Sequence, residues 1–164
     1  MTKIRVATID DLEQMLDCQK SVWESWRGIL PDAEERLAKY ESSEREKIKD
    51  RMRRFMENPD NIVLVAEEEN QVVGFVEGNV WAGVSYIAFI GVRPEHRGRG
   101  IGTNLLKEYI RRSRERGAHK VYVWTQVDLK SAIKLYLGAG FVPEGFLRRH
   151  FYKKDMIIFS KLLE

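Results

Sequence analysis

Glycines at positions 98, 100 and 102 alternate with other residues in the segment Arg97-Gly98-Arg99-Gly100-Ile101-Gly102-Thr103. Because glycine has no side chain, a ligand can approach the backbone closely at these positions. A helix that begins in such a turn offers unpaired N–H groups and the positive end of its dipole. Arg97 and Arg99 add guanidinium groups suited to phosphate oxygens, with Arg93 and His96 nearby. The segment therefore predicts a cradle for a diphosphate-bearing ligand.

The spacing of these glycines narrows the choice of ligand. The dinucleotide fingerprint G-x-G-x-x-G, started at Gly98, needs glycine or alanine at position 103, where this chain has Thr103. No Gly-Lys-Ser/Thr follows at the distance that the Walker motif requires. Since glycines also occur in plain turns, the residues alone leave open which diphosphate binds and whether the glycines only shape the chain.

Periodicity places this segment between a strand and a helix. An apolar strand ends before Pro94, and apolar residues recur at helical spacing from Gly100 to Arg116, where Gly117 is suited to end the helix. Elsewhere a turn is expected at 69–71, and Thr8 and Asp11 resemble a helix capping box. Strands are expected at 4–7, 61–66, 72–79, 86–92, 120–124, 141–146 and 156–161, and further helices after residue 11, over 33–58 with a break near 42–43, and at 131–137.

Composition describes an ordinary folded protein. The 164 residues are 43% hydrophobic and 32% charged, which suffices for a core and predicts a single domain over residues 1–164. A formal net charge of +3 does not indicate nucleic-acid binding, and the basic end of the helix at 111–116 also complements the helix dipole. The single Cys18 excludes an intrachain disulfide and a cysteine-based zinc site. With no apolar leader or membrane-length stretch, we expect a cytoplasmic protein without a membrane partner.

Two stretches resemble signatures of one family. Residues 90–102, Ile90-Gly91-Val92-Arg93-Pro94-Glu95-His96-Arg97-Gly98-Arg99-Gly100-Ile101-Gly102, look like the central motif of the GNAT superfamily of acyltransferases, whose core is Arg/Gln-x-x-Gly-x-Gly/Ala. Residues 132–141, Ala132-Ile133-Lys134-Leu135-Tyr136-Leu137-Gly138-Ala139-Gly140-Phe141, are similar to its second signature, Ala…Leu-Tyr…Gly-Phe. The resemblance spans most of the chain, although the N-terminal third matches only in the order of its elements. It implies the GNAT fold, of class α/β (α+β), with a mixed central sheet of about six to seven strands and four flanking helices.

The resemblance also implies an activity, an acetyl-CoA-dependent N-acetyltransferase. The backbone of Ile90, Gly91 and Val92 would hold the pantetheine arm and the thioester as an added strand, and residues 97–103 would take the pyrophosphate. The parallel strands that begin near Ile87 and Lys120 would diverge to admit acetyl-CoA.

Catalysis requires a neutral amine, so a base or a water chain must remove a proton. Tyr136 occupies the family position of the phenol that protonates the departing thiolate, although periodicity alone favours a core aromatic. Some relatives place a glutamate on the strand at 86–92, which has no carboxylate here. Glu77 on the preceding strand is the candidate base, and an exposed strand carboxylate is the simpler interpretation. The family's usual asparagine is replaced by Leu129.

The acceptor pocket that the resemblance implies lies between the first two helices and the last strand pair. The aromatic residues available there are Trp23, Trp26, Tyr40, Phe55, Phe151 and Tyr152. They do not select between a small-molecule amine and a peptide or protein N-terminus. No metal is expected, and a homodimer is a possible assembly. The missing glutamate and asparagine leave one alternative function, a non-catalytic module that senses a CoA thioester or another nucleotide.

Overall fold

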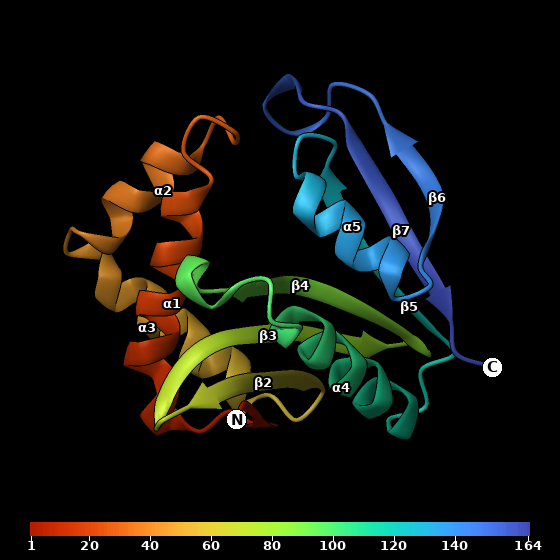
Figure 1. The fold of residues 1–164 in the computed structure, drawn as a ribbon, viewed down its shortest axis with the longest axis horizontal. Helices are drawn as coiled ribbons and strands as arrows, with labels where there is room; N and C mark the ends of the chain where they lie inside the picture. The colour runs from red at the N-terminus through yellow and green to blue at the C-terminus, as the bar shows by residue number, and fades with distance from the viewer.

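The protein, described by a computed structural model that covers residues 1–164, forms one seven-stranded sheet with helices on both faces (Figure 1). The strands are β1 (Lys3–Val6), β2 (Asn61–Glu68), β3 (Gln71–Trp81), β4 (Val84–Val92), β5 (Lys120–Gln126), β6 (Val142–Leu147) and β7 (Met156–Leu162). The helices are α1 (Leu12–Ser25), α2 (Ala33–Tyr40), α3 (Glu44–Glu57), α4 (Ile101–Glu115) and α5 (Lys130–Gly138), with short 3-10 turns at Ile9–Asp11, Pro94–His96 and Phe151–Lys153.

The strand order is β1-β2-β3-β4-β5-β7-β6, and every neighbouring pair is antiparallel except β4 with β5. The predicted turn between β2 and β3 is confirmed, because Glu69 and Asn70 both have positive φ, as a tight hairpin requires. The capping pair is also confirmed: the backbone N–H of Thr8 donates to Oδ2 of Asp11 at 2.7 Å, at the start of a 3-10 turn.

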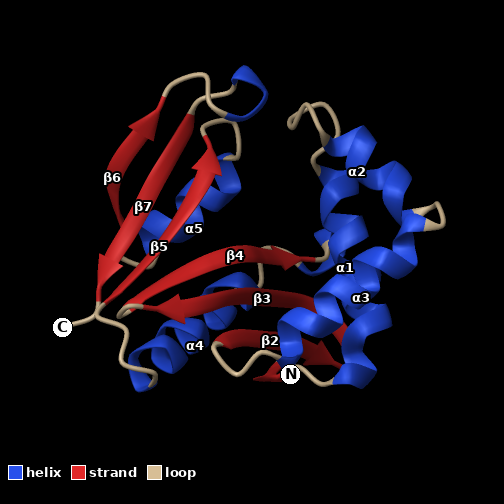
Figure 2. Ribbon diagram, turned by 180° about the vertical axis from the view of Figure 1, so that it is seen from behind, coloured by secondary structure: helices blue, strands red, loops and turns tan.

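The helices divide between the two faces of the sheet. Figures 1 and 2 show α4 and α5 on one face and α1 to α3 on the other. The larger core lies under α4 and includes Leu105 and Tyr109, which are fully buried against β2 to β5. The smaller core lies between α1 and the sheet around Leu16 and Phe75. Cys18, with its side chain fully buried, belongs to this second core.

β4 and β5 separate soon after they begin. Only three residue pairs join them, the last being Tyr86 with Tyr122, although β4 continues to Val92 and β5 to Gln126. A bulge follows directly on β4: Gly78 of β3 is opposite Ile87 and Glu77 is opposite Phe89, so Ala88 has no partner residue. Since a bulge bends its strand, β4 turns away from β5 (Figure 2), and the predicted divergence is confirmed.

The structure has five helices, and the expectation of four is therefore wrong. The expected helix over 33–58 is two helices, α2 and α3, separated by residues 41–43. The hydroxyl of Ser42 donates to the carbonyl of Lys39 and accepts from the N–H of Glu44. Serine hydroxyls compete in this way with helical hydrogen bonds, which explains why the break predicted near residue 42 separates two helices.

Candidate active site

The space between the diverging β4 and β5 contains two adjoining cavities. The first, which we call the loop cavity, has a volume of about 460 Å³ and lies beside residues 97–103. The second, the aromatic cavity, has a volume of about 630 Å³ and lies between α1, α2 and the ends of β5 and β7. Trp26, Ile90 and Ala132 line both cavities, so a ligand can extend from one into the other.

Nine of the ten residues predicted to bind the cofactor line the loop cavity: Ile90, Gly91, Val92, Arg97, Gly98, Gly100, Ile101, Gly102 and Thr103. The opposite wall comes from α5, with Ser131, Lys134 and Leu135. The structure thus brings together the two sequence signatures, which face each other across this cavity.

Backbone geometry makes this loop suitable for an anion. Gly98 and Gly100 have φ values of +76° and +80°, which side-chain-bearing residues rarely adopt. A Cβ at either position would meet no atom within 4 Å, so the backbone conformation and not crowding requires glycine here. α4 begins at Ile101, no acidic residue occupies its first turn, and its first N–H groups have no partner within the helix. The helix therefore presents an unopposed positive end beside the loop cavity.

The arginines of the loop have different roles. Nε of Arg97 donates to the carbonyl of Val92, and Nη2 donates to Oγ of Ser25, both at 3.0 Å. Burial lowers the pKa of this guanidinium, which lines the loop cavity. Arg99, which the sequence assigned to phosphate, instead forms an ion pair with Glu68 at 2.9 Å. Nε of Arg93 donates to the carbonyl of Val72.

Glu68, at the end of β2, fixes the start of the glycine loop. Its carboxylate accepts hydrogen bonds from the hydroxyl of Thr2 and from the guanidinium of Arg99, and it lies 3.0 Å from Nδ1 of His96. These contacts, with the Thr2 hydrogen bond making the largest contribution, hold the pKa of Glu68 below its ordinary value. A surface carboxylate thus connects the N-terminus, the 3-10 turn at Pro94–His96 and the loop.

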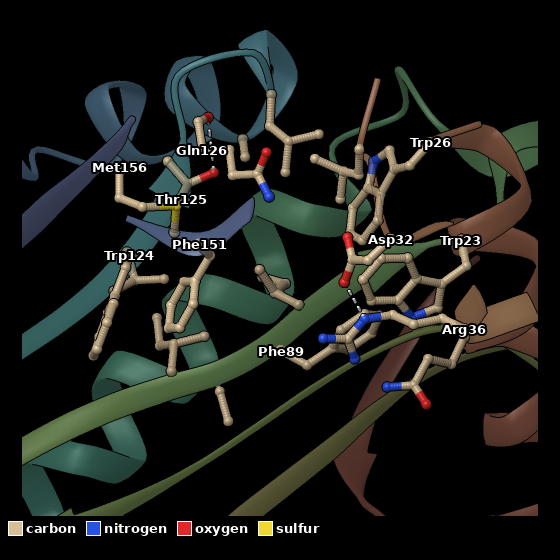
Figure 3. A pocket seen from close by; sticks show the side chains of 18 of the residues that line it. Trp23, Trp26, Asp32, Arg36, Phe89, Trp124, Thr125, Gln126, Phe151 and Met156 are labelled. Carbon is tan, nitrogen blue, oxygen red and sulfur yellow. Dashed lines mark hydrogen bonds and ion pairs between the residues drawn. The ribbon is translucent and has the colours of Figure 1, made fainter. Parts of the chain in front are cut away.

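The aromatic cavity is built from side chains that are distant in sequence (Figure 3). Besides Tyr136, its aromatic lining consists of Trp23, Trp26, Tyr40, Phe89, Trp124, Phe151 and Tyr152. Five of these were among the six that the sequence proposed. The sixth, Phe55, lies against the smaller core and does not line the cavity. Trp124 stacks on Phe151 with a centroid separation of 5.8 Å, which closes the cavity on the side of β5.

Tyr136 packs in the core and also reaches the aromatic cavity. Its ring contacts Phe141 and Phe159, with centroid separations of 5.8 Å and 5.9 Å, and is only 4% exposed. The same side chain lines the aromatic cavity. Burial raises the pKa of its phenol above the ordinary value, so the hydroxyl stays protonated at neutral pH.

Glu77 is half-buried in the wall of the aromatic cavity, so the interpretation as an exposed strand carboxylate is wrong. Because of the bulge, its β4 neighbour is Phe89, and its Oε2 is enclosed without a hydrogen-bond partner. Burial raises the pKa of Glu77 to about 7, and the nearby Arg51 only partly opposes this shift.

Sequence reasoning missed six polar residues that line the aromatic cavity: Gln19, Asp32, Arg36, Arg51, Thr125 and Gln126. Nε of Arg36 donates to Oδ2 of Asp32 at 2.6 Å, and the Cζ atom of Arg36 lies 4.4 Å from the ring centroid of Trp23. The four-residue spacing of Asp32 and Arg36 could have predicted the ion pair. It could not have predicted that the pair faces a cavity, because that depends on how α2 packs.

The structure contains no cluster of three or more His, Cys, Asp or Glu residues placed to hold a metal ion. None of its helices combines the length and the apolar character that crossing a bilayer requires.

Comparison with known proteins identifies the family. Residues 17–141 match the Acetyltransferase (GNAT) family. The chain is 31% identical over 156 residues to an uncharacterized N-acetyltransferase of Methanocaldococcus jannaschii; the match covers 88% of the chain and 64% of that protein, so the chain spans less than two thirds of this relative. It is 24% identical over 145 residues to the spermidine N(1)-acetyltransferase of Thermoplasma acidophilum, covering 87% of the chain and 89% of that protein.

A solved crystal structure has a similar fold. The PaiA N-acetyltransferase from Thermoplasma acidophilum, whose crystal structure is a complex with coenzyme A, matches this structure with a TM-score of 0.81 and 22% identity over 99% of both chains. The family match covers about three quarters of the chain and includes both signatures, and the mixed sheet with its separated strands agrees with the fold that they implied. The protein therefore belongs to the Acetyltransferase (GNAT) family.

Proposed function

We propose that the protein transfers an acetyl group from acetyl-CoA to a primary amine, either a small-molecule amine or a peptide or protein N-terminus. One observation carries this proposal: the loop cavity, beside the start of α4, opens at Ile90 into an aromatic cavity lined by a protonated phenol and a carboxyl with a pKa of about 7. The first cavity suits a diphosphate and the second suits proton transfer at an amine.

The residues of the loop cavity fit acetyl-CoA. The first-turn N–H groups of α4 and the loop at 97–103 would hold the pyrophosphate. Beyond Tyr86 the edge of β4 that faces β5 has no partner strand, which leaves the backbone near Ile90 and Gly91 free to bind an extended pantetheine arm. The carbonyl of Val92 already accepts a hydrogen bond from Arg97, so we expect it to contribute less. Bound acetyl-CoA supplies the activated carbonyl that an amine can attack.

Glu77 is the proposed base. An ammonium must lose a proton before its nitrogen can form a bond to carbon, and the best base has a pKa close to the working pH. A carboxyl with a pKa of about 7 meets this condition, whereas an ordinary glutamate would be too weak a base. Glu77 would take this proton either directly or through a water molecule.

Tyr136 is the proposed acid. It would give its proton to the sulfur as the carbon–sulfur bond breaks and the carbon–nitrogen bond forms. The second proton of the amine nitrogen would then return to the Tyr136 phenolate, while Glu77 holds the proton that the ammonium lost before the attack and releases it to water. Because burial keeps the phenol protonated, Tyr136 is ready to act as a donor at any physiological pH. Its position on α5, beside the shared residue Ala132, is next to the junction of the two cavities.

Calorimetric titration with acetyl-CoA, with NADPH and ATP as controls, tests the cofactor. We expect saturable binding of acetyl-CoA alone. Thiol release is then measured across a panel of primary amines, with mass spectrometry of the products. Binding of CoA with no thiol release for any amine would favour the non-catalytic sensor, and equal binding of all three nucleotides would remove the basis for the proposal.

The proposal takes residues 1–164 as a single catalytic domain that needs no metal. A homodimer also stays a prediction: the edge strand β6 exposes Val142 and Phe146, and β7 exposes Leu162, which gives an apolar surface for a second copy.

A further inference from the structure

Arg36 has a fixed guanidinium. Its Nε is bound to the buried Asp32 at 2.6 Å, and its Cζ lies 4.4 Å from the centroid of the Trp23 ring. A charge-assisted hydrogen bond on one side and a cation–π contact on the other hold the group in one orientation. Figure 3 shows this guanidinium between Asp32 and Trp23, extending into the aromatic cavity.

The two terminal amino groups of Arg36 remain free. Nε makes the only hydrogen bond and ion pair of this side chain, which is 50% exposed. Asp32 therefore neutralises and orients Arg36 through its Nε atom. The edge formed by the two terminal amino groups stays free to bind a planar anion. A guanidinium edge of this kind matches the two oxygens of a carboxylate.

The other charged residues of the cavity also favour a carboxylate on the acceptor. Its charged lining consists of Asp32, Glu77, Arg36 and Arg51. Oδ2 of Asp32 is paired with Arg36, and its buried Oδ1 has no hydrogen-bond partner. Arg51 has no ion pair in the structure, and Glu77 is the proposed base. Once the acceptor amine engages Glu77, the charge left unpaired in the cavity is therefore the positive charge of Arg51. A second ammonium group on the acceptor would be repelled, whereas a carboxylate would be attracted.

The other walls suit an apolar side chain. The rings of Trp26, Phe89, Trp124 and Phe151 form much of the remaining wall of the cavity, and Gln126 faces Asp32 across it (Figure 3). A volume of about 630 Å³ is ample for a free amino acid.

We infer that the acceptor is a free amino acid with an apolar or aromatic side chain, whose α-carboxylate binds to the terminal amino groups of Arg36. This inference rests on the proposed acetyl transfer and narrows its acceptor. Arg36 determines specificity, Asp32 and Trp23 position it, and Arg51 adds a second attractive charge. A polyamine and a peptide N-terminus both lack the α-carboxylate and would bind more weakly.

Matched ligands test the inference through binding, independently of turnover. The protein is saturated with CoA, which cannot transfer an acetyl group, and is then titrated calorimetrically with phenylalanine, phenylalanine amide, phenethylamine and spermidine. We expect phenylalanine to bind at least about 10-fold more tightly than the other three, because only its carboxylate can form two parallel hydrogen bonds with the guanidinium. Equal or tighter binding of phenethylamine, the amide or spermidine would overturn the inference.

A variant pair localises the effect. Arg36→Gln should remove the preference for phenylalanine over phenethylamine, while leaving the affinity for CoA and the binding of phenethylamine unchanged. Lys39→Gln removes the same charge from the same helix but lies outside the cavity, so it should retain the preference. A preference that persists in Arg36→Gln would show that another group binds the carboxylate.

Turnover separates this inference from the proposed function. Acetylation of spermidine or phenethylamine in preference to phenylalanine would confirm an acetyltransferase and reject the amino-acid acceptor. Tight binding of phenylalanine to the CoA complex with no acetylation of any amine would support the carboxylate site and reject the proposed activity.

Discussion

The loop cavity and the aromatic cavity meet at Ile90 but are built in different ways. The loop cavity is formed mainly by two short stretches, 90–103 and 131–138, and much of its surface is backbone. The aromatic cavity takes its lining from α1, α2, α3, β3, β4, β5, α5, β7 and the turn before β7, and nearly all of its chemistry comes from side chains.

This difference indicates that the loop cavity is a general kind of binding site, whereas the aromatic cavity is particular to this protein. A backbone site needs glycines with left-handed φ and the start of a helix, which many sequences can provide in the same way. A side-chain site needs each residue to be positioned by a different element. We therefore expect changes in the loop cavity to abolish the binding of any CoA thioester, and changes in the aromatic cavity to alter the rate, the pH dependence or the choice of acceptor.

The largest effect is expected from Gly102→Glu. A Cβ at this position would lie 3.8 Å from Val92 and Leu135, in ordinary contact, so the substitution is tolerated locally. A glutamate in the first turn also suits the helix dipole, and the fold should remain stable. Its carboxylate would occupy the loop cavity and repel phosphate, so acetyl-CoA affinity measured by calorimetry should fall by about 100-fold or more. Gly102→Ala is the control and should bind acetyl-CoA nearly normally; a tight-binding Gly102→Glu protein would refute the assignment of the cradle.

Tyr136→Phe tests the aromatic cavity. The change removes one hydroxyl and keeps the ring against Phe141 and Phe159, so the free energy of unfolding should hardly change. Loss of the proposed acid should lower kcat about 100-fold without altering the affinity for acetyl-CoA. Tyr122→Phe, on β5 and outside both cavities, is the matched control. An unchanged kcat in Tyr136→Phe would leave Tyr136 with a packing role only.

Glu77→Gln should have a smaller effect that depends on pH. In the native enzyme the carboxyl becomes a base as the pH rises through its pKa of about 7, so kcat/KM should rise with an inflection there. The glutamine variant should lose that inflection and be about 10-fold slower at pH 8. An inflection that is retained in Glu77→Gln would assign the proton transfer to another group.

The same variant tests whether Glu77 is buried as the structure shows. The folded-state pKa of about 7 lies above the unfolded value near 4.5, so the folded protein binds the proton more tightly. Its contribution to stability is complete below pH 4.5 and is lost as the pH rises through 7. Wild-type protein should therefore lose about 1 to 3 kcal/mol relative to Glu77→Gln between pH 5 and pH 8 in urea unfolding. Parallel stability profiles for the two proteins would contradict this.

Local patterns predicted most of the fold. The hairpin turn at 69–71, the capping pair of Thr8 and Asp11 and the end of α4 before Gly117 were found because each depends on residues within a few positions. The break near residue 42 was predicted, but the number of helices was not, because the sequence does not show whether a serine hydroxyl only bends a helix or, as at Ser42, ends one helix and precedes the next.

The sequence predicted some residues of the candidate site and missed the surroundings or the presence of others. Arg99 was assigned to phosphate because its side chain lies in the loop, but the partner that draws it away, Glu68, is 31 residues distant. Glu77 was expected on the surface because alternation along a strand does not show what covers it. Asp32 and Arg36 were not considered, since nothing local distinguishes them from other charged pairs on a solvated helix.

The sequence by itself determined the family, the glycine turn that leads into α4 and the place of Tyr136 on a helix, because glycine conformations and helix starts are set by neighbouring residues. Only the tertiary structure decided the burial that raises the pKa of Glu77, the bulge at Ala88 that accompanies the opening of the cleft, and the free guanidinium edge of Arg36. Each of these depends on elements far apart in the chain, whose packing sets the local dielectric and the direction in which a charge points.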